Sequence, residues 1–368
     1  MSAMSFTAAD HQHMARAIQL AARGMYTTDP NLRVGCVIVK DDRVIGEGWH
    51  ERAGEAHAEV HALQQAGEQA KGATAYVSLE PCCHHGKTPP CSDALIAAQV
   101  GRVVVAMQDP NPQVAGNGMH QLTEAGIQVE LGLLEAQAKA LNPGFIQRMQ
   151  TRRPFVRNKL AMSLDGRTAM ADGDSKWITG EAARQDVQCL RARSSAIMTG
   201  VGTVLADDPA LTVRLADTER QPLRVIVDTN LSTPLTARLL REPGQTLIIT
   251  SNEDQDLHGT LREAGAEIMQ VGNDGQAIDL HIVLEKLAER NINEVLLETG
   301  ATLSGAMLEA QLIDEMVIYM APLLMGDTAR GLYRLPHLQR MADRIELDIR
   351  DVRVVGKDLR ITVTPIYI

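Results

Sequence analysis

Short apolar segments typical of β-strands alternate with helical segments along most of the chain, and this alternation limits the fold more than any other feature. Strands connected through helices assemble into one sheet with the helices packed on its faces. Residues 34–39 and 43–49 flank Lys40-Asp41-Asp42, a spacing that predicts a β-hairpin. The pattern therefore predicts a layered α/β domain. Its other expected strands are 73–79, 102–107 and 127–133, and its expected helices are 8–23, 57–70 and 92–99.

The pattern is interrupted at residues 141–156, where a Pro-Gly pair, a basic cluster and a second proline follow one another. We place a domain boundary there, which divides the 368 residues into domains 1–150 and 151–368. A second α/β pattern follows and ends at 344–366, whose polar–apolar alternation predicts an antiparallel hairpin. Its other expected strands are 156–162, 196–200, 223–228, 246–250, 294–298 and 315–321, and its expected helices are 180–193, 279–290 and 302–311.

The composition argues against several classes of function. A net charge of −10, an aromatic content of 3% and the lack of a basic stripe argue against a nucleic-acid partner. No apolar run approaches the ~20 residues that span a bilayer, so no membrane partner is expected. The N-terminus has neither the basic nor the apolar region of a secretory signal, so we expect a cytoplasmic protein.

Three of the five cysteines, Cys82, Cys83 and Cys91, lie within ten residues of one another. An odd number of cysteines with this crowding does not form a disulfide framework, and in a reducing compartment it indicates metal ligation. The remaining two, Cys36 and Cys189, lie in apolar strand and helix settings, and we expect them in the cores.

An imidazole and a carboxylate complete this group, because His57-Ala58-Glu59 opens an expected helix. Three protein ligands leave one position of a zinc ion open for water, and zinc lowers the pKa of that water to about 7. A carboxylate that is not a ligand can then carry its proton to a departing amine. We therefore assign His57, Cys82 and Cys91 as zinc ligands and Glu59 as the catalytic proton shuttle of a hydrolytic deaminase.

A closed structural zinc site is the alternative, with Cys83, His84 or His85 as the fourth ligand. It leaves unexplained why Glu59 lies two residues from a ligand at the start of a helix. His61, on the same helix, is expected to be a partly buried polar residue.

The spacing between the cysteines separates this chain from the general zinc-deaminase pattern, H-x-E followed by P-C-x-x-C. Eight residues lie between Cys82 and Cys91. The segments HAEVHAL (57–63) and LEPCCHHGKTPPCSDALI (79–96) closely resemble the bifunctional riboflavin biosynthesis family, in which a deaminase is fused to a reductase. Segments 107–129, 158–170 and 201–214 also resemble that family, so the resemblance covers essentially the whole chain.

The resemblance implies a three-layer α/β/α domain similar to cytidine deaminase, followed by an α/β domain similar to dihydrofolate reductase. It implies hydrolytic deamination of 2,5-diamino-6-(5-phosphoribosylamino)pyrimidin-4-one and then NADPH-dependent reduction of the ribosyl group of the product to ribityl. It also implies that deaminase substrate contacts fall on Asn31, His84, Lys87 and Thr88. This chain departs from the family at Leu32-Arg33, where a proline commonly follows the asparagine, and at Cys83, which is often serine.

The second domain carries weaker signals of its own. It lacks the G-x-G-x-x-G fingerprint, but glycine-containing turns occur at 199–203 and 298–305. A helix N-terminus at such a turn can bind a pyrophosphate, and an ordinary strand–helix turn explains the same residues equally well.

The resemblance favours NADPH binding at these turns. Implied cofactor contacts are Ala161, Trp177, Thr203, Asp207, Thr229, Gly300, Ala301, Thr302, Leu303, Ser304, Gly305 and Ala306. Implied substrate contacts are Ser175, Arg191, Leu211, Arg214 and Glu298. The two arginines suit a substrate phosphate, because a guanidinium binds it through two parallel hydrogen bonds. Lys159 and Glu298 are candidates to position or protonate the ring-opened sugar.

Two other functions stay open at this point. One is a deaminase of another base or nucleoside with a non-catalytic C-terminal half, and the other is a zinc-stapled binding or regulatory protein. The expected partner is a small phosphoribosyl pyrimidine, and the family implies a homo-oligomer, either a dimer or a tetramer.

Overall fold

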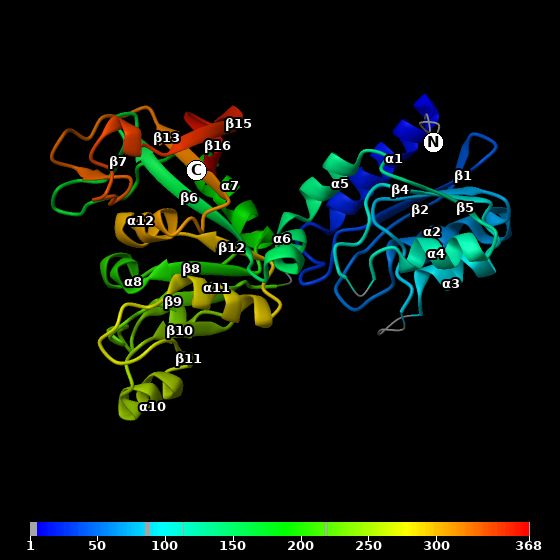
Figure 1. The fold of residues 1–368 in the computed structure, drawn as a ribbon. Coiled ribbons are helices and arrows are strands. Elements are labelled where there is room, and N and C mark those ends of the chain that lie inside the picture. The colour runs from blue at the N-terminus through cyan, green and yellow to red at the C-terminus, as the bar shows by residue number, and fades with distance from the viewer. Residues whose placement is uncertain (1–5, 85–88, 113, 217, 219, 368) are drawn as a thin grey trace. The chain divides into compact units, whose positions relative to one another are not determined.

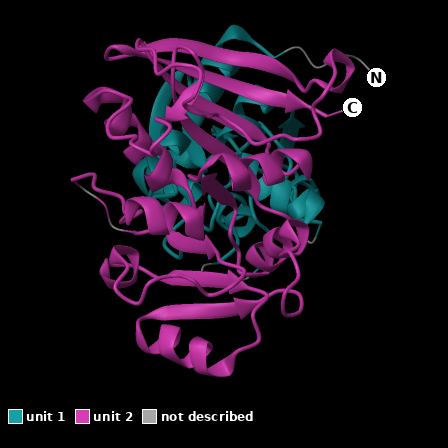
Figure 2. Cartoon of the chain, turned by 90° about the vertical axis from the view of Figure 1, so that its left-hand side faces the viewer, with its two compact units in different colours: residues 1–152 teal, residues 153–368 magenta. Residues whose placement is uncertain are grey.

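The computed structural model describes residues 6–84, 89–112, 114–216, 218 and 220–367. The chain forms two compact units, residues 1–152 and 153–368, which Figure 2 shows in different colours. Each unit has its own sheet and its own hydrophobic core, so each is described by itself.

The first unit is built on a five-stranded sheet with the order β2-β1-β3-β4-β5 (Figure 1). Strand β1 pairs antiparallel with β2 and β3, whereas β3, β4 and β5 are parallel. Asp41 and Asp42 both have positive φ, as the tight turn of the predicted β1–β2 hairpin requires. The strands are Gly35–Lys40 (β1), Arg43–Trp49 (β2), Thr74–Val77 (β3), Arg102–Val105 (β4) and Gln128–Leu131 (β5).

Helices cover both faces of this sheet, which confirms the predicted three-layer architecture. Alternate side chains of β1 point to opposite faces of the sheet. Cys36 and Ile38 pack in the core on one face, and Val37 and Val39 pack in the core on the other. Helices α2 (Ala58–Ala66), α3 (Cys91–Ala97) and α4 (Asn117–Glu124) pack on the first face. Helices α1 (Ala8–Ala21), α5 (Glu135–Leu141) and α6 (Pro143–Thr151) pack on the second face. Short 3-10 turns extend α1 over Ala22–Gly24 and α2 over Gly67–Ala70.

The interrupted segment at 141–156 is mostly helical, contrary to the break expected there. Pro143 occupies the first turn of α6. Backbone N–H groups in the first turn make no hydrogen bond within the helix, so proline loses none there, and its fixed φ suits the helix. The Pro-Gly pair therefore starts a helix, and the change from one unit to the next falls after α6, between Arg152 and Arg153.

The second unit contains a nine-stranded sheet in the order β11-β10-β9-β8-β12-β6-β13-β16-β15. In this order, all strands from β11 through β13 are parallel to their neighbours. The last two, β16 and β15, form the predicted terminal hairpin, and β16 pairs antiparallel with β13. A separate two-stranded ribbon joins β7 (Arg167–Ala169) to β14 (Arg330–Gly331). The sheet strands are Phe155–Ser163 (β6), Ala196–Gly200 (β8), Leu223–Val227 (β9), Thr246–Thr250 (β10), Ala266–Gln270 (β11), Glu294–Leu297 (β12), Glu315–Ala321 (β13), Glu346–Val355 (β15) and Asp358–Ile366 (β16).

Helices again pack on both faces of this sheet. Apolar residues of α11 (Leu280–Glu289) and α12 (Ala301–Glu309) fill the largest core, and α7 (Glu181–Arg193) packs on the opposite face. The shorter helices are α8 (Val201–Asp207), α9 (Arg238–Arg241) and α10 (Gln255–Glu263), and a 3-10 turn spans Met341–Asp343. Strands β7, β11 and β14 and helices α4 to α6 and α8 to α10 were not anticipated from the sequence.

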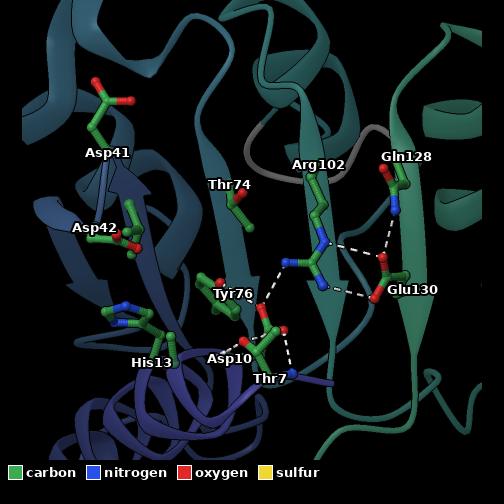
Figure 3. A pocket seen from close by; sticks show the side chains of 12 residues that line it. Thr7, Asp10, His13, Asp41, Asp42, Thr74, Tyr76, Arg102, Gln128 and Glu130 are labelled. Atoms are coloured by element: carbon green, nitrogen blue, oxygen red, sulfur yellow. Dashed lines mark hydrogen bonds and ion pairs between the residues drawn. The ribbon is translucent and has the colours of Figure 1, made fainter. Parts of the chain in front are cut away.

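A buried ionic cluster joins the start of α1 to the sheet of the first unit, beside a pocket of about 570 Å³ (Figure 3). Asp10 accepts hydrogen bonds from the Thr7 backbone at 2.8 Å, from the Tyr76 hydroxyl at 2.8 Å and from Arg102 at 2.6 Å. Arg102 also pairs with Glu130 at 2.8 Å. Burial opposes ionisation, but these donors, above all Arg102, hold the pKa of Asp10 well below its usual range.

We expect D10N to lower the free energy of unfolding by about 2 kcal/mol at pH 7, because the amide cannot replace a carboxylate bonded to Arg102. The folded-state pKa is depressed, so the carboxylate contributes stability above its unfolded pKa of about 4 and loses it as the pH falls. Denaturant titrations should show the difference from wild type shrinking progressively below about pH 4. The matched control D41N, at an exposed hairpin position of the same pocket, should change little; an equal loss in both variants would contradict the assignment.

Candidate active sites

His57 and Glu59 are positioned by the start of α2. His57 is the N-cap residue, with extended backbone angles (φ −79°, ψ 165°), so its side chain lies outside the first helical turn. Glu59 lies within that turn and is 3% exposed. The change from extended to helical backbone at His57 therefore places an imidazole beside a buried carboxylate.

Cys82 and Cys91 reach the same point from two other segments. Cys82 lies on the loop after β3, and Cys91 is the first residue of α3. His57 Nδ1 lies 3.2 Å from Cys91 Sγ and 3.5 Å from Cys82 Sγ, and the Cys91 backbone N–H donates to Cys82 Sγ at 3.3 Å. The three potential ligand atoms all lie within 4.8 Å of one another. One imidazole nitrogen and two thiolates at this spacing fit a zinc ion with an open position.

Within the described residues, no fourth histidine, cysteine, aspartate or glutamate joins this group of three. Cys83 and His84 therefore do not close the site, and His85 lies outside the described residues. Cys36 is buried as expected, Cys189 is half-buried, and His61 is half-buried with a buried Nε2 that has no hydrogen-bond partner in the described part of the chain.

The electrostatics of the group suit proton transfer. Burial, assisted by the neighbouring Cys82 thiolate, raises the pKa of Glu59 to about 7. Hydrogen bonds from Cys91 and His57 lower the pKa of Cys82 to about 4, which favours the thiolate that a metal requires. Glu59 Oε2 is buried and has no hydrogen-bond partner among the described residues. This oxygen is therefore available to a group that the chain itself does not supply.

His50 connects the predicted substrate residue Asn31 to the predicted zinc ligand His57. Asn31 Nδ2 is 3.2 Å from His50 Nε2, and the His50 ring meets the His57 ring edge-on at 5.3 Å between centroids. Leu32-Arg33 is where this chain departs from the family pattern, and Arg33 there is buried. The Arg33 backbone N–H donates to Asn142 Oδ1, and Asn142 Nδ2 donates to the Arg33 carbonyl. The loop is thereby tied to the start of α6.

Of the other deaminase contacts expected from the resemblance, His84 is exposed, and Lys87 and Thr88 lie outside the described residues. Two buried polar residues near the predicted ligands, His50 and Asp109, were not singled out from the sequence. His50 directly follows β2, and Asp109 lies just beyond β4, the neighbour of the strand that leads to Cys82. Burial raises the pKa of Asp109. Polar residues just past strand ends were the signal that could have found them.

In the second unit, two of the predicted residues contact a third, Glu298, which directly follows β12. Arg191 donates to both oxygens of Glu298, at 2.6 and 3.1 Å, and Lys159 Nζ lies 3.3 Å from Oε2. Burial of Glu298 opposes ionisation, but Arg191 and Lys159 lower its pKa to about 2. Arg191 also donates to the Thr212 carbonyl beside buried Leu211, whereas the Arg214 side chain is exposed.

The two glycine-containing turns lie next to each other in the structure. Gly200 is the last residue of β8 and Gly300 lies shortly after β12, and these two strands are neighbours in the sheet (Figure 1). The Gly200 N–H donates to Thr299 Oγ1 at 3.2 Å, and Gly300 is the N-cap of α12. Thr203 lies on α8 in the same region, and Thr229 follows β9, the other neighbour of β8.

The remaining predicted cofactor and substrate positions vary in exposure. Trp177 is 71% exposed with Arg184 over its ring, Ser175 and Ala161 are half-buried, and Asp207 lies 3.9 Å from Lys176. Within α12, a Cβ at Gly305 would lie 2.2 Å from the Arg334 carbonyl oxygen, so packing alone requires this glycine. The other members of that helical turn are exposed Thr302, half-buried Ala301, Leu303 and Ala306, and buried Ser304.

None of the helices in the described part of the chain is long and apolar enough to span a bilayer. The fold and the two sites together define a zinc-dependent deaminase unit joined to an α/β unit of the reductase type. Residues 7–107 match the cytidine and deoxycytidylate deaminase zinc-binding region, and residues 154–361 match the RibD C-terminal domain. The chain belongs to the RibD family of riboflavin biosynthesis proteins.

Relatives of nearly equal length support this membership. Riboflavin biosynthesis protein RibD of Escherichia coli is 51% identical over 95% of this chain and 98% of its own length, and the Haemophilus influenzae protein is 48% identical over 98% and 99%. The solved structure of Acinetobacter baumannii RibD has a TM-score of 0.91 with 49% identity, covering 98% of this chain and 99% of that one. A Thermotoga maritima diaminohydroxyphosphoribosylaminopyrimidine deaminase/5-amino-6-(5-phosphoribosylamino)uracil reductase has a TM-score of 0.85 with 35% identity, covering 97% and 99%.

Membership in the family confirms the resemblance inferred from the cysteine loop and both predicted fold classes. It also confirms the pairing of a zinc-dependent deaminase with an NADPH-dependent reductase, and with it the two predicted cofactors. The two other functions left open by the sequence, a deaminase with a non-catalytic C-terminal half and a zinc-stapled binding protein, are thereby set aside.

The ligand assignment predicts that C82S loses zinc, because removing one of three ligand atoms leaves a site too weak to hold the ion. Metal content after dialysis should fall from about one zinc per chain to a small fraction. The matched control is C83S, which removes the adjacent thiol that lies outside the group of three. Zinc loss from C83S equal to that from C82S would show instead that Cys83 is a ligand.

Proposed function

We propose that residues 1–152 deaminate 2,5-diamino-6-(5-phosphoribosylamino)pyrimidin-4-one and that residues 153–368 reduce the ribosyl group of the resulting 5-amino-6-(5-phosphoribosylamino)uracil to ribityl. The observation that carries the proposal is the convergence of His57, Cys82 and Cys91 around one point with Glu59 buried beside it. The activity named for the Thermotoga maritima relative, 35% identical over 97% of this chain, supports the choice of substrate.

In the deaminase, His57, Cys82 and Cys91 would hold zinc. When bound, zinc acidifies water and so supplies a nucleophile at neutral pH. Glu59 takes up the water proton on its unpartnered Oε2 and delivers it to the departing amine nitrogen, which leaves as ammonia. A carboxyl group whose pKa lies near 7 can both accept and release a proton at physiological pH. Asn31 binds the pyrimidine, with His84, Lys87 and Thr88 as further substrate contacts.

In the reductase, the turn that starts α12 at Gly300 would bind the NADPH pyrophosphate, because the first N–H groups of a helix lack helical partners and this helix starts shortly after the carboxyl end of β12. When bound, NADPH supplies the hydride that reduces C1′ of the ring-opened sugar. Lys159 is the group that orients or protonates the sugar, since Glu298 holds its ammonium at 3.3 Å. Arg214, whose side chain is exposed, remains free to meet the substrate phosphate, whereas Arg191 is engaged by Glu298.

The test of this function is E59Q, which keeps the size of the side chain and removes its ability to transfer a proton. We expect zinc content to match wild type and ammonia release from the diaminopyrimidine phosphate to fall at least about 100-fold. NADPH oxidation driven by the already deaminated intermediate should be unchanged. Deaminase turnover within a few-fold of wild type would reject Glu59 as the shuttle, and a lack of NADPH oxidation in wild type would reject the second activity.

The homo-oligomer expected from the family is supported by the outer edge of the second sheet. Strand β15 forms this edge, and Ile349, Val352 and Val354 on it are 64%, 54% and 71% exposed. An edge strand with exposed apolar side chains is a site for pairing with another chain. We propose that two copies associate through β15. The cytoplasmic location stays a prediction.

We expect the double substitution I349D/V354D to reduce the mass measured by light scattering after gel filtration to that of one chain, because charges on this strand oppose its burial. L257D is the matched control, since Leu257 is an exposed apolar residue on α10 of the same unit. An unchanged mass for the double variant would place the interface elsewhere.

A further inference from the structure

A buried carboxylate, Glu80, lies two residues before the zinc ligand Cys82 and is not used by the chemistry described above. It is 2% exposed. Glu80 Oε1 accepts the backbone N–H of Gly118 at 3.0 Å, and Oε2 accepts those of Gly116 at 3.0 Å and Asp109 at 3.2 Å. A fourth N–H, from Met119, lies 3.4 Å from Oε1.

These contacts make Glu80 the cap of α4. The N-cap residue of that helix is Gly116, which has no side chain to satisfy the free N–H groups of the first turn. The Glu80 carboxylate supplies the missing acceptors and also places a negative charge at the positive end of the helix. All four neighbours of the carboxylate are N–H donors. A glutamine in place of Glu80 would therefore direct its own NH₂ group at one or more of these donors.

Through the same contacts, α4 packs closely against the loop that carries Cys82. A Cβ at Gly118 would lie 1.9 Å from the carbonyl oxygen of Pro81, so the helix and the loop meet at backbone distance. Only glycine fits there. The position of Cys82 is thereby tied to α4.

Helix α4 also reaches the segment that carries the second thiolate. Gln121 on α4 lies 2.8 Å from Ser92 Oγ through Oε1 and donates to Asp93 at 2.6 Å. Ser92, which directly follows Cys91, donates its backbone N–H to the Cys82 carbonyl at 3.1 Å, and its Oγ lies 3.0 Å from the same oxygen. Helix α4 thus contacts both segments that carry the thiolates, the Cys82 loop through Gly118 and the start of α3 through Gln121.

We infer that Glu80 is a positioning residue for zinc: by capping α4 it sets the distance and direction between the Cys82 and Cys91 thiolates. This inference rests on the proposed zinc site. Groups behind the ligands of a metal commonly change its affinity by about 10- to 100-fold when removed. A purely structural cap would affect folding stability and leave the bound metal unchanged.

The test compares E80Q with E130Q, which also neutralises a buried carboxylate of this unit but one that pairs with Arg102. Zinc affinity is measured on each full-length protein by competition with a chromophoric chelator. The absorption bands of the Co²⁺-substituted proteins report the thiolate geometry directly. We expect E80Q to weaken zinc binding about 10- to 100-fold and to shift the cobalt bands, whereas E130Q lowers the melting temperature without either change.

S92A keeps the experiment informative should E80Q not fold, because it removes only one hydroxyl from the same connection. We expect it to weaken zinc binding several-fold and to shift the cobalt bands in the same direction. Wild-type affinity and spectra in a folded E80Q would overturn the inference, and so would wild-type affinity and spectra in S92A if E80Q does not fold. Failure of the wild-type protein itself to bind either metal would instead contradict the proposed zinc site.

Discussion

Parallel strands that end at a common sheet edge are the constraint on which both sites depend. In the first unit, the loop after β3 and the starts of α2 and α3 meet, which brings an imidazole and two thiols from separate segments within 4.8 Å. In the second unit, β8 and β12 are neighbours, so Gly200 and Gly300 begin adjacent helices. In each case the sheet supplies the proximity, and the loops have only to supply the chemical groups.

Two buried glutamates show how the surroundings decide what a carboxylate does. Glu59 has an oxygen without a partner in the described residues, and burial raises its pKa to about 7. Glu298 is also buried but faces Arg191 and Lys159, which lower its pKa to about 2. The first carboxylate can exchange a proton at neutral pH, whereas the second stays ionised and holds two cations in place. In the proposed mechanism, the same residue type thus serves proton transfer in one unit and electrostatic positioning in the other.

The sequence predicted the zinc group because its members are chemically distinctive and lie close together in the chain. It predicted most strands of both sheets because their apolar runs are long. It did not show that Glu80 caps α4. The two lie more than thirty residues apart in the sequence, and no local motif links a glutamate before Pro81 to that helix. His50 was missed for the same reason. Pro143 was misjudged as a break because a proline at the start of a helix and one in a loop follow the same local pattern.

The difference in how readily the two sites could be found follows from their chemistry. A metal ligand must be one of a few side chains, so substitution is tightly limited and the residues stand out. Hydride transfer requires mainly that two reactants be aligned. Backbone N–H groups and side-chain shape can meet that requirement, and the residues predicted to do so lie on or after β6, β8, β9 and β12, strands separated by long stretches of chain. The Arg191–Glu298–Lys159 cluster has no characteristic spacing in the sequence, because its members lie on β6, on α7 and after β12. Such a site becomes visible when the sheet order is known.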